Sequence, residues 1–154
     1  MRIRVKSGSI RDRALSITLI AAVAAAIAML GYTISNPPAE PFTEFYILGS
    51  SGEAVDYPKE LVVGEEARVI VGIINREQET VSYSVEISID GAMNNKVGPV
   101  ELNHNEKWEE IVSFTPTNIG DNQRVEFRLH WYKNGEPVFK YMVYLEPVDV
   151  KEQR

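Results

Sequence analysis

Twenty-one consecutive residues without a charged side chain run from Ala14 to Ile34. A helix of this length spans about 30 Å, which is the thickness of the hydrocarbon core of a bilayer. The run therefore predicts one transmembrane helix over residues 14–34. The alternative is a cleaved secretory signal, whose apolar region is usually about 7–15 residues long and ends at a small-x-small site. Residues 31–36, GYTISN, offer a poor site of that kind, so we expect an uncleaved anchor.

Charge is distributed unevenly on the two sides of this run. Residues 1–13 hold five of the 16 basic residues and one of the 22 acidic ones, which leaves 11 basic and 21 acidic residues beyond them. Basic flanks stay in the cytoplasm. We therefore expect residues 1–13 to be a basic cytoplasmic tail and the C-terminal part to lie outside the cell. The acidic excess also argues against nucleic acid as a partner.

Small residues recur within the apolar run. Ala21, Ala25 and Ala28 are spaced so that a second helix can approach closely, which makes them candidates for packing against a partner helix. The alternative is that alanine serves here only as a good helix former. Both interpretations stay open from the sequence.

Proline marks the end of the apolar run. Residues 35–41 contain three prolines, which cannot continue a helix and favour an extended, semi-rigid spacer. We expect a folded ectodomain over residues 42–150 and a short tail over residues 151–154.

Alternation of apolar and polar residues dominates residues 42–150, with Gly, Pro or Asn every dozen or so residues. This pattern predicts about eight short antiparallel strands and an immunoglobulin-like β-sandwich, a mainly β fold. The clearest strands place Val81, Tyr83, Val85, Ile87 and Ile89 on one face, and likewise Val125, Phe127, Leu129 and Trp131, and Phe139, Tyr141, Val143 and Leu145. The other expected strands cover residues 42–49, 59–63, 67–74, 99–103 and 107–115.

The last two of the clear strands should form a hairpin around Asn134-Gly135. A two-residue loop would oppose inward Leu129 to Lys140, which breaks the alternation. We therefore expect a turn with a bulge at Gly135, which pairs Leu129 with Phe139 and Phe127 with Tyr141.

Residues capable of catalysis or metal binding are scattered. His104 and His130 lie in different elements, residues 90–95 form a turn instead of a calcium loop, and Glu109 and Glu110 point to opposite faces of a strand. There is no cysteine, and no nucleophile elbow or phosphate-binding glycine loop. We predict that the protein is not an enzyme and expect no catalytic residue, cofactor or metal.

A string of motifs gives a family resemblance. Residues 42–49, FTEFYILG, are followed by Tyr57-Pro58, Gly64-Glu65 and residues 71–75, VGIIN, and further matches run through Trp108 to residues 126–129, EFRL. The chain resembles an archaeal membrane-protein family, domain of unknown function 1616, over most of residues 42–148. The resemblance implies an archaeal envelope protein and brings no catalytic residues. Family members typically carry several amino-terminal spans, whereas this sequence has one.

Three functions remain open from the sequence. The leading one is a structural or accessory subunit that binds another protein of the envelope or membrane. The second is a ligand- or carbohydrate-binding module, in which Trp108, Trp131, Tyr132 and Tyr144 would form a stacking platform. The third is a pilin-like filament subunit, for which residues 11–14, RDRA, are a poor processing site.

Overall fold

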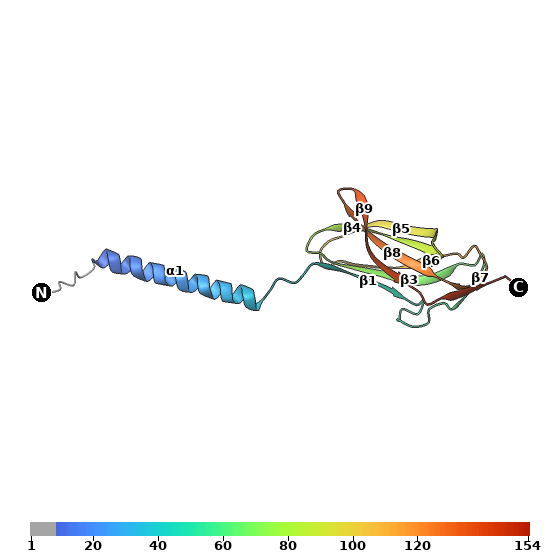
Figure 1. Cartoon of the computed structure of the whole chain (residues 1–154), viewed down its shortest axis with the longest axis horizontal. Helices are drawn as coiled ribbons and strands as arrows, with labels where there is room; N and C mark the ends of the chain where they lie inside the picture. Colours follow the sequence, from blue (N-terminus) through green and yellow to red (C-terminus); the bar gives the residue numbers. More distant parts are fainter. Residues whose placement is uncertain (1–8) are drawn as a thin grey trace. The chain divides into compact units, whose positions relative to one another are not determined.

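The computed structural model describes residues 9–154, so the predicted basic residues Arg2, Arg4 and Lys6 lie outside the described part. The chain divides into two units, one before residue 40 and one over Glu40–Arg154 (Figure 1). Each unit is described by itself.

The first unit is one helix, α1, over Ile10–Ser35. It begins four residues before the predicted span because Asp12 closes its first turn by accepting a hydrogen bond from the Ser9 N–H at 3.0 Å. The helix ends before Pro37, since a residue that precedes proline disfavours the helical conformation. Every described side chain of α1 is exposed.

The second unit is a β-sandwich, as predicted. A three-stranded sheet has the order β1-β3-β6, a four-stranded sheet the order β5-β4-β8-β9, and a small sheet the order β2-β10-β7. All pairs are antiparallel except β2 with β10. The strands are β1 Phe42–Leu48, β2 Glu60–Val62, β3 Ala67–Arg76, β4 Val81–Ile89, β5 Ala92–Leu102, β6 Lys107–Phe114, β7 Gly120–Gln123, β8 Val125–Lys133, β9 Glu136–Tyr144 and β10 Val148–Lys151.

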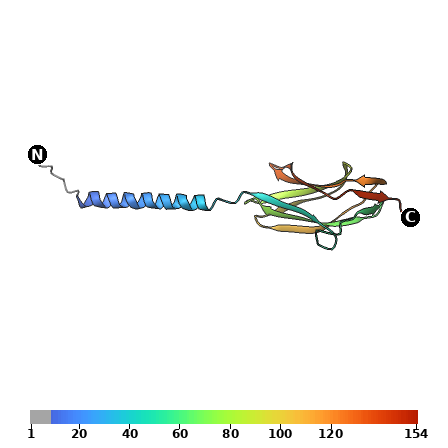
Figure 2. The same cartoon turned by 60° about the horizontal axis from the view of Figure 1, so that its bottom comes forward.

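The core lies between the three-stranded and the four-stranded sheets, which form the layers seen in Figure 2. The predicted inward residues of β4 are all buried, as are Val125, Phe127 and Leu129 of β8. Phe114 of β6 meets Phe127 edge to face across the sandwich, with ring centroids 6.0 Å apart. The period-two pattern thus identified the buried faces of these strands correctly.

The turn predicted over residues 90–95 is shorter than expected. Only Asp90 and Gly91 turn, both with positive φ, and Ala92 already pairs with Ile89. The following asparagines belong to β5, where the Asn94 and Asn95 amides donate to the Thr115 and Ser113 carbonyls at 2.7 Å. Side-chain bonds to another strand were not visible in the local pattern. The short strands β7 and β10 were missed as well.

The predicted register of the β8–β9 hairpin is also wrong. Asn134 and Gly135 both have positive φ and form a two-residue turn, which matches the natural twist of paired strands. The bulge lies further along β9: His130 pairs with Phe139 and Leu129 with Tyr141, so Lys140 is the extra residue. Tyr141, Val143 and Leu145 therefore keep their inward face, whereas Phe139 points outward and is 55% exposed.

Candidate functional site

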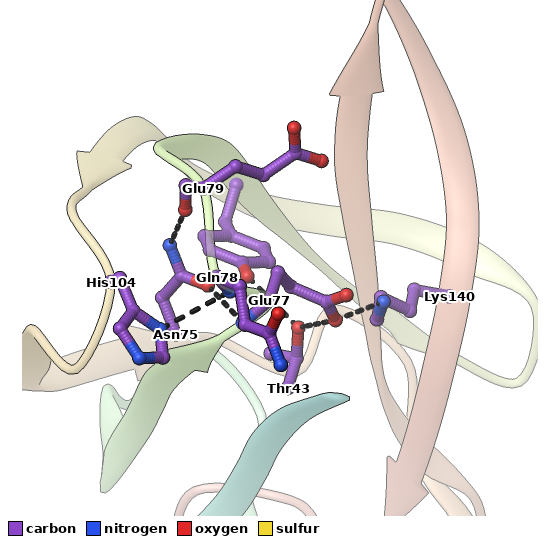
Figure 3. A network of polar contacts seen from close by, with 8 residues as sticks. Thr43, Asn75, Glu77, Gln78, Glu79, His104 and Lys140 are labelled. Atoms are coloured by element: carbon purple, nitrogen blue, oxygen red, sulfur yellow. Dashed lines mark hydrogen bonds and ion pairs between the residues drawn. The ribbon is translucent and has the colours of Figure 1, made fainter. Parts of the chain in front are cut away.

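The most densely connected polar cluster lies at the end of the sandwich where β1 begins. Its centre is the Glu77 carboxylate, which follows β3 and is only 6% exposed. Thr43 reaches it from β1, and Lys140 reaches it from the bulge of β9 with a side chain 12% exposed. Figure 3 shows the carboxylate between these two partners. Lys140 is the one charged residue between Pro137 and Leu145, and the bulge turns its side chain toward the interior.

The contacts around Glu77 satisfy its charge. One carboxylate oxygen, Oε1, pairs with the Lys140 ammonium and accepts a hydrogen bond from the Thr43 hydroxyl at 2.6 Å. The Thr43 hydroxyl also lies 2.9 Å from the Tyr83 hydroxyl. Burial raises the pKa of Tyr83 to about 12, so this phenol stays neutral. A buried ion pair with this many hydrogen bonds is costly to break from one side.

Asn75 holds the loop that carries Glu77. Its amide nitrogen donates to the Glu79 and Leu102 carbonyls at 2.7 and 2.8 Å, and its oxygen accepts from the Glu77 N–H at 2.8 Å. The cluster therefore joins β1, β3, β4, β5 and β9. Its acid and base neutralise each other inside the fold, an arrangement that favours a structural role over proton transfer.

His104 and His130 lie apart and in unlike surroundings. His104 Nδ1 accepts a hydrogen bond from the Gln78 N–H at 3.1 Å, which places it beside the Glu77 loop (Figure 3). His130 lies on the outer face of β8, edge to face with Phe139. The sequence suggested neither contact, because both partners come from other elements.

Glu109 and Glu110 lie on opposite faces of β6, as the sequence predicted. Glu109 pairs with Lys107 at 2.8 Å and accepts from the Tyr46 hydroxyl. The bond to Lys107, followed by the bond from Tyr46, lowers the pKa of Glu109. Burial and the hydrogen bond to the Glu109 carboxylate raise the pKa of Tyr46. The two carboxylates share no site.

The aromatic residues proposed as a stacking platform are not brought together. Trp108 and Trp131 pack against the core from different sheets. The Lys140 and Lys133 ammoniums lie 3.6 and 4.0 Å from the Trp131 ring centroid, and Tyr144 stands on the outer face of β9 beneath Arg124. Tyr132 faces the outer side at the far end of the same sheet.

The predicted helix-packing residues Ala21, Ala25 and Ala28 are exposed on α1. Over residues 9–154 no three His, Asp or Glu side chains gather in a way that would hold a metal ion.

Sequence comparison assigns the family. The model of the family described as "Domain of unknown function (DUF1616)" matches residues 36–141. The chain belongs to this family. No curated protein matches it. Family membership thus agrees with the resemblance seen in the motifs and assigns no activity to the DUF1616 chain.

Solved structures similar to this chain share its β-sandwich. The C-terminal domain of Wzt is 13% identical, with a TM-score of 0.50 over 75% of this chain and 80% of that domain. The CARDB domain of the PF1109 protein from Pyrococcus furiosus, solved in complex with di-metal ions, is 20% identical, with a TM-score of 0.48 over 73% and 90%. At these identities the likeness extends to the fold alone.

Proposed function

We propose that this DUF1616 protein is a single-pass membrane protein whose β-sandwich, outside the cell, binds another protein of the envelope or membrane as an accessory subunit. Residues 1–13 stay in the cytoplasm, and the sandwich is the binding part.

Support for the anchor comes from α1 itself. The helix is long and apolar enough to cross a membrane, and none of its described side chains is covered by the rest of the chain. In water this exposure would be unfavourable at about 25 cal/mol per Å² of apolar surface. Lipid around the helix removes that cost. The basic residues before Ala14 favour the cytoplasmic side for the amino terminus.

The observation that carries the binding role is the exposure of β9. On its outer face the large side chains Phe139, Met142 and Tyr144 are between 41% and 60% exposed. Contiguous exposed apolar groups of this kind mark surfaces that bind other molecules. β9 is also an edge strand of its sheet, and exposed edge strands are common sites of protein contact.

Orientation is tested by adding protease to intact cells that produce the full-length protein. We expect digestion of the sandwich while an epitope placed before residue 14 stays protected. Protection of the sandwich would contradict the topology. Release of membrane-free protein with a new amino terminus near Ser35 would instead show a cleaved signal.

The role of the helix in partner binding is tested by replacing Ala21, Ala25 and Ala28 together with Leu. The span becomes more apolar, so insertion is retained, but close approach of a second helix is lost. We expect weaker co-purification of the partner from gentle detergent extracts. The matched control replaces Ala22 and Ala26, which lie on a different face of α1, with Leu. Equal recovery of all partners with both variants would remove α1 from the binding mechanism.

A further inference from the structure

The hydrophobic pattern of β9 and its observed pairing disagree at one point. Phe139, Tyr141, Val143 and Leu145 alternate without a break in the sequence, so an unbulged strand would turn all four inward. The structure instead turns Lys140 inward, 12% exposed, and leaves Phe139 on the outer face, 55% exposed. The bulge therefore exchanges an apolar side chain for a charged one at the inner face of the sheet.

Another position of the bulge would reverse this exchange. If Glu136 were the extra residue instead of Lys140, the segment between them would move by one residue along β8, and each of its side chains would change face. Phe139 would then oppose Trp131 on the inner face. Lys140 would oppose His130 on the outer face. The uninterrupted apolar alternation of β9 fits this second arrangement.

The rest of the sandwich does not oppose such a local shift. Tyr141 pairs with Leu129 in both arrangements, because only the residues before it move. The Leu145 N–H donates to the Val125 carbonyl at 3.0 Å, which fixes the far end of the strand. In the described part of the chain β9 is an edge strand that pairs with β8 alone, so no second strand holds the residues that move. The shift is confined to residues 136–140.

The Glu77 carboxylate favours the observed arrangement. It pairs with the Lys140 ammonium and accepts a hydrogen bond from the Thr43 hydroxyl at 2.6 Å (Figure 3). The same ammonium lies 3.6 Å from the centroid of the Trp131 ring, which is a favourable cation–π contact. Turning Lys140 outward would leave the buried carboxylate without a cation, whereas keeping it inward leaves the Phe139 ring in water. These two costs oppose each other.

We propose that residues 136–140 form a two-state segment and that the Glu77–Lys140 ion pair is the lock that selects its register. In the locked state Lys140 points inward and Phe139 outward, as observed. In the released state the bulge lies at Glu136, Phe139 packs on Trp131, and Lys140 reaches solvent. A buried polar contact selects one register where hydrophobic burial alone allows two.

Release of the lock would change the outer surface of β9. Phe139 is one of the exposed side chains that support the proposed binding function, and in the released state it leaves that surface. A partner that covers Phe139 would bind the locked state better and would shift the population toward it. This consequence rests on the proposed function, whereas the two-state segment itself does not.

Two pairs of introduced cysteines distinguish the states, because the chain has no cysteine of its own. In the locked state Tyr132 opposes Pro137 on the outer face, and Val138 opposes Trp131 on the inner face. In the released state Val138 would oppose Tyr132. A disulfide requires two side chains that face each other. Tyr132→Cys with Pro137→Cys therefore reports the locked state, and Tyr132→Cys with Val138→Cys reports the released state.

The experiment uses the full-length protein, purified in detergent and oxidised briefly. Free thiols are then alkylated, and the yield of each disulfide is measured by mass spectrometry. Without further substitution we expect the 132–137 disulfide to predominate. Glu77→Gln removes the carboxylate that holds Lys140 inside and should raise the 132–138 yield about tenfold. Glu79→Gln, at an exposed carboxylate two residues along the chain, is the matched control and should change neither yield.

Two further variants test the balance between the states. Thr43→Val removes one hydrogen bond to Glu77 but keeps the ion pair, so it should raise the 132–138 yield less than Glu77→Gln does. Phe139→Ser combined with Glu77→Gln removes the ring that gains by turning inward, so the 132–138 yield should fall again. Protease resistance of the sandwich verifies that each variant is folded.

If Glu77→Gln does not fold, Thr43→Val decides in its place, and an unchanged 132–138 yield in the deciding variant would overturn the two-state segment. An equal rise with Glu79→Gln would show that the Glu77–Lys140 pair is not the lock. A 132–138 yield that Phe139→Ser fails to lower would overturn the role of the ring. These measurements involve no partner, so their failure leaves the proposed binding function standing.

Discussion

The helix and the sandwich obtain their structures in opposite ways. The rest of the chain buries no described side chain of α1. The backbone hydrogen bonds of a helix close within the helix itself, so its apolar surface is the part that needs apolar surroundings from outside the chain. The sandwich buries 19 hydrophobic side chains against one another, and its strands join residues far apart in the sequence. The comparison teaches that changes in α1 should affect location, whereas changes in the sandwich core should affect folding.

The largest effect should come from the core. Phe127 is fully buried and contacts Phe114 across the sandwich, so Phe127→Ala should lower the free energy of unfolding by about 4 kcal/mol. Urea denaturation of the detergent-solubilised protein, followed by tryptophan fluorescence, measures this change. Leu19→Ala in α1 is the control and should leave the transition of the sandwich unchanged. A lower free energy of unfolding in both variants would contradict the separation between helix and sandwich.

A charge in the helix should have a comparable but separate effect. Ala24 lies near the middle of the apolar run, and Ala24→Arg should cost about 3 kcal/mol of membrane insertion. Carbonate extraction of membranes should then release part of the protein. The unfolding transition of the sandwich should not move, and Ala24→Leu should remain fully membrane-bound.

Breaking the Glu77–Lys140 pair should have a smaller effect, which is confined to the stability of the sandwich. Lys140→Met leaves the nearly buried Glu77 carboxylate without its cation, which should cost about 2 kcal/mol of stability. Adding Glu77→Gln removes the unpaired charge and should restore part of that loss. A double variant less stable than Lys140→Met alone would show that the ion pair is not what holds β9.

The smallest effect concerns alkaline pH. The pKa of Tyr83 is raised to about 12 in the folded chain, whereas the phenol in the unfolded chain titrates near 10.0. Between these two pH values the Tyr83 phenol ionises in the unfolded chain but stays protonated in the folded chain. The contribution of Tyr83 to stability is therefore fully present below about pH 10 and falls as the pH rises toward 12. Urea midpoints measured over this range should fall more steeply for the native protein than for Tyr83→Phe. Parallel curves would contradict the raised pKa.

Sequence patterns predicted much of the fold because they depend on short periods. Uncharged residues over six turns predicted α1, and alternation predicted the buried faces of β4 and β8. The same reasoning failed for residues 90–95 and for the β8–β9 register, where the decisive contacts involve other strands. Asn94 and Asn95 bond to carbonyls about 20 residues away in sequence. Ala21, Ala25 and Ala28 were proposed from spacing, whereas the outward direction of Phe139, Met142 and Tyr144 follows from the bulge in the pairing of β8 with β9.

The amino-acid sequence by itself determined that an apolar helix precedes a β-sandwich, because both rest on the local periodicity of hydrophobic side chains. Only the tertiary structure decided where β9 carries its bulge. Lys140 is the extra residue there, and it pairs with Glu77, which lies 63 residues earlier in the chain. A contact between residues so far apart leaves no periodic signal, since it depends on how the sheets pack. The same packing decides which outward side chains of the four-stranded sheet lie side by side.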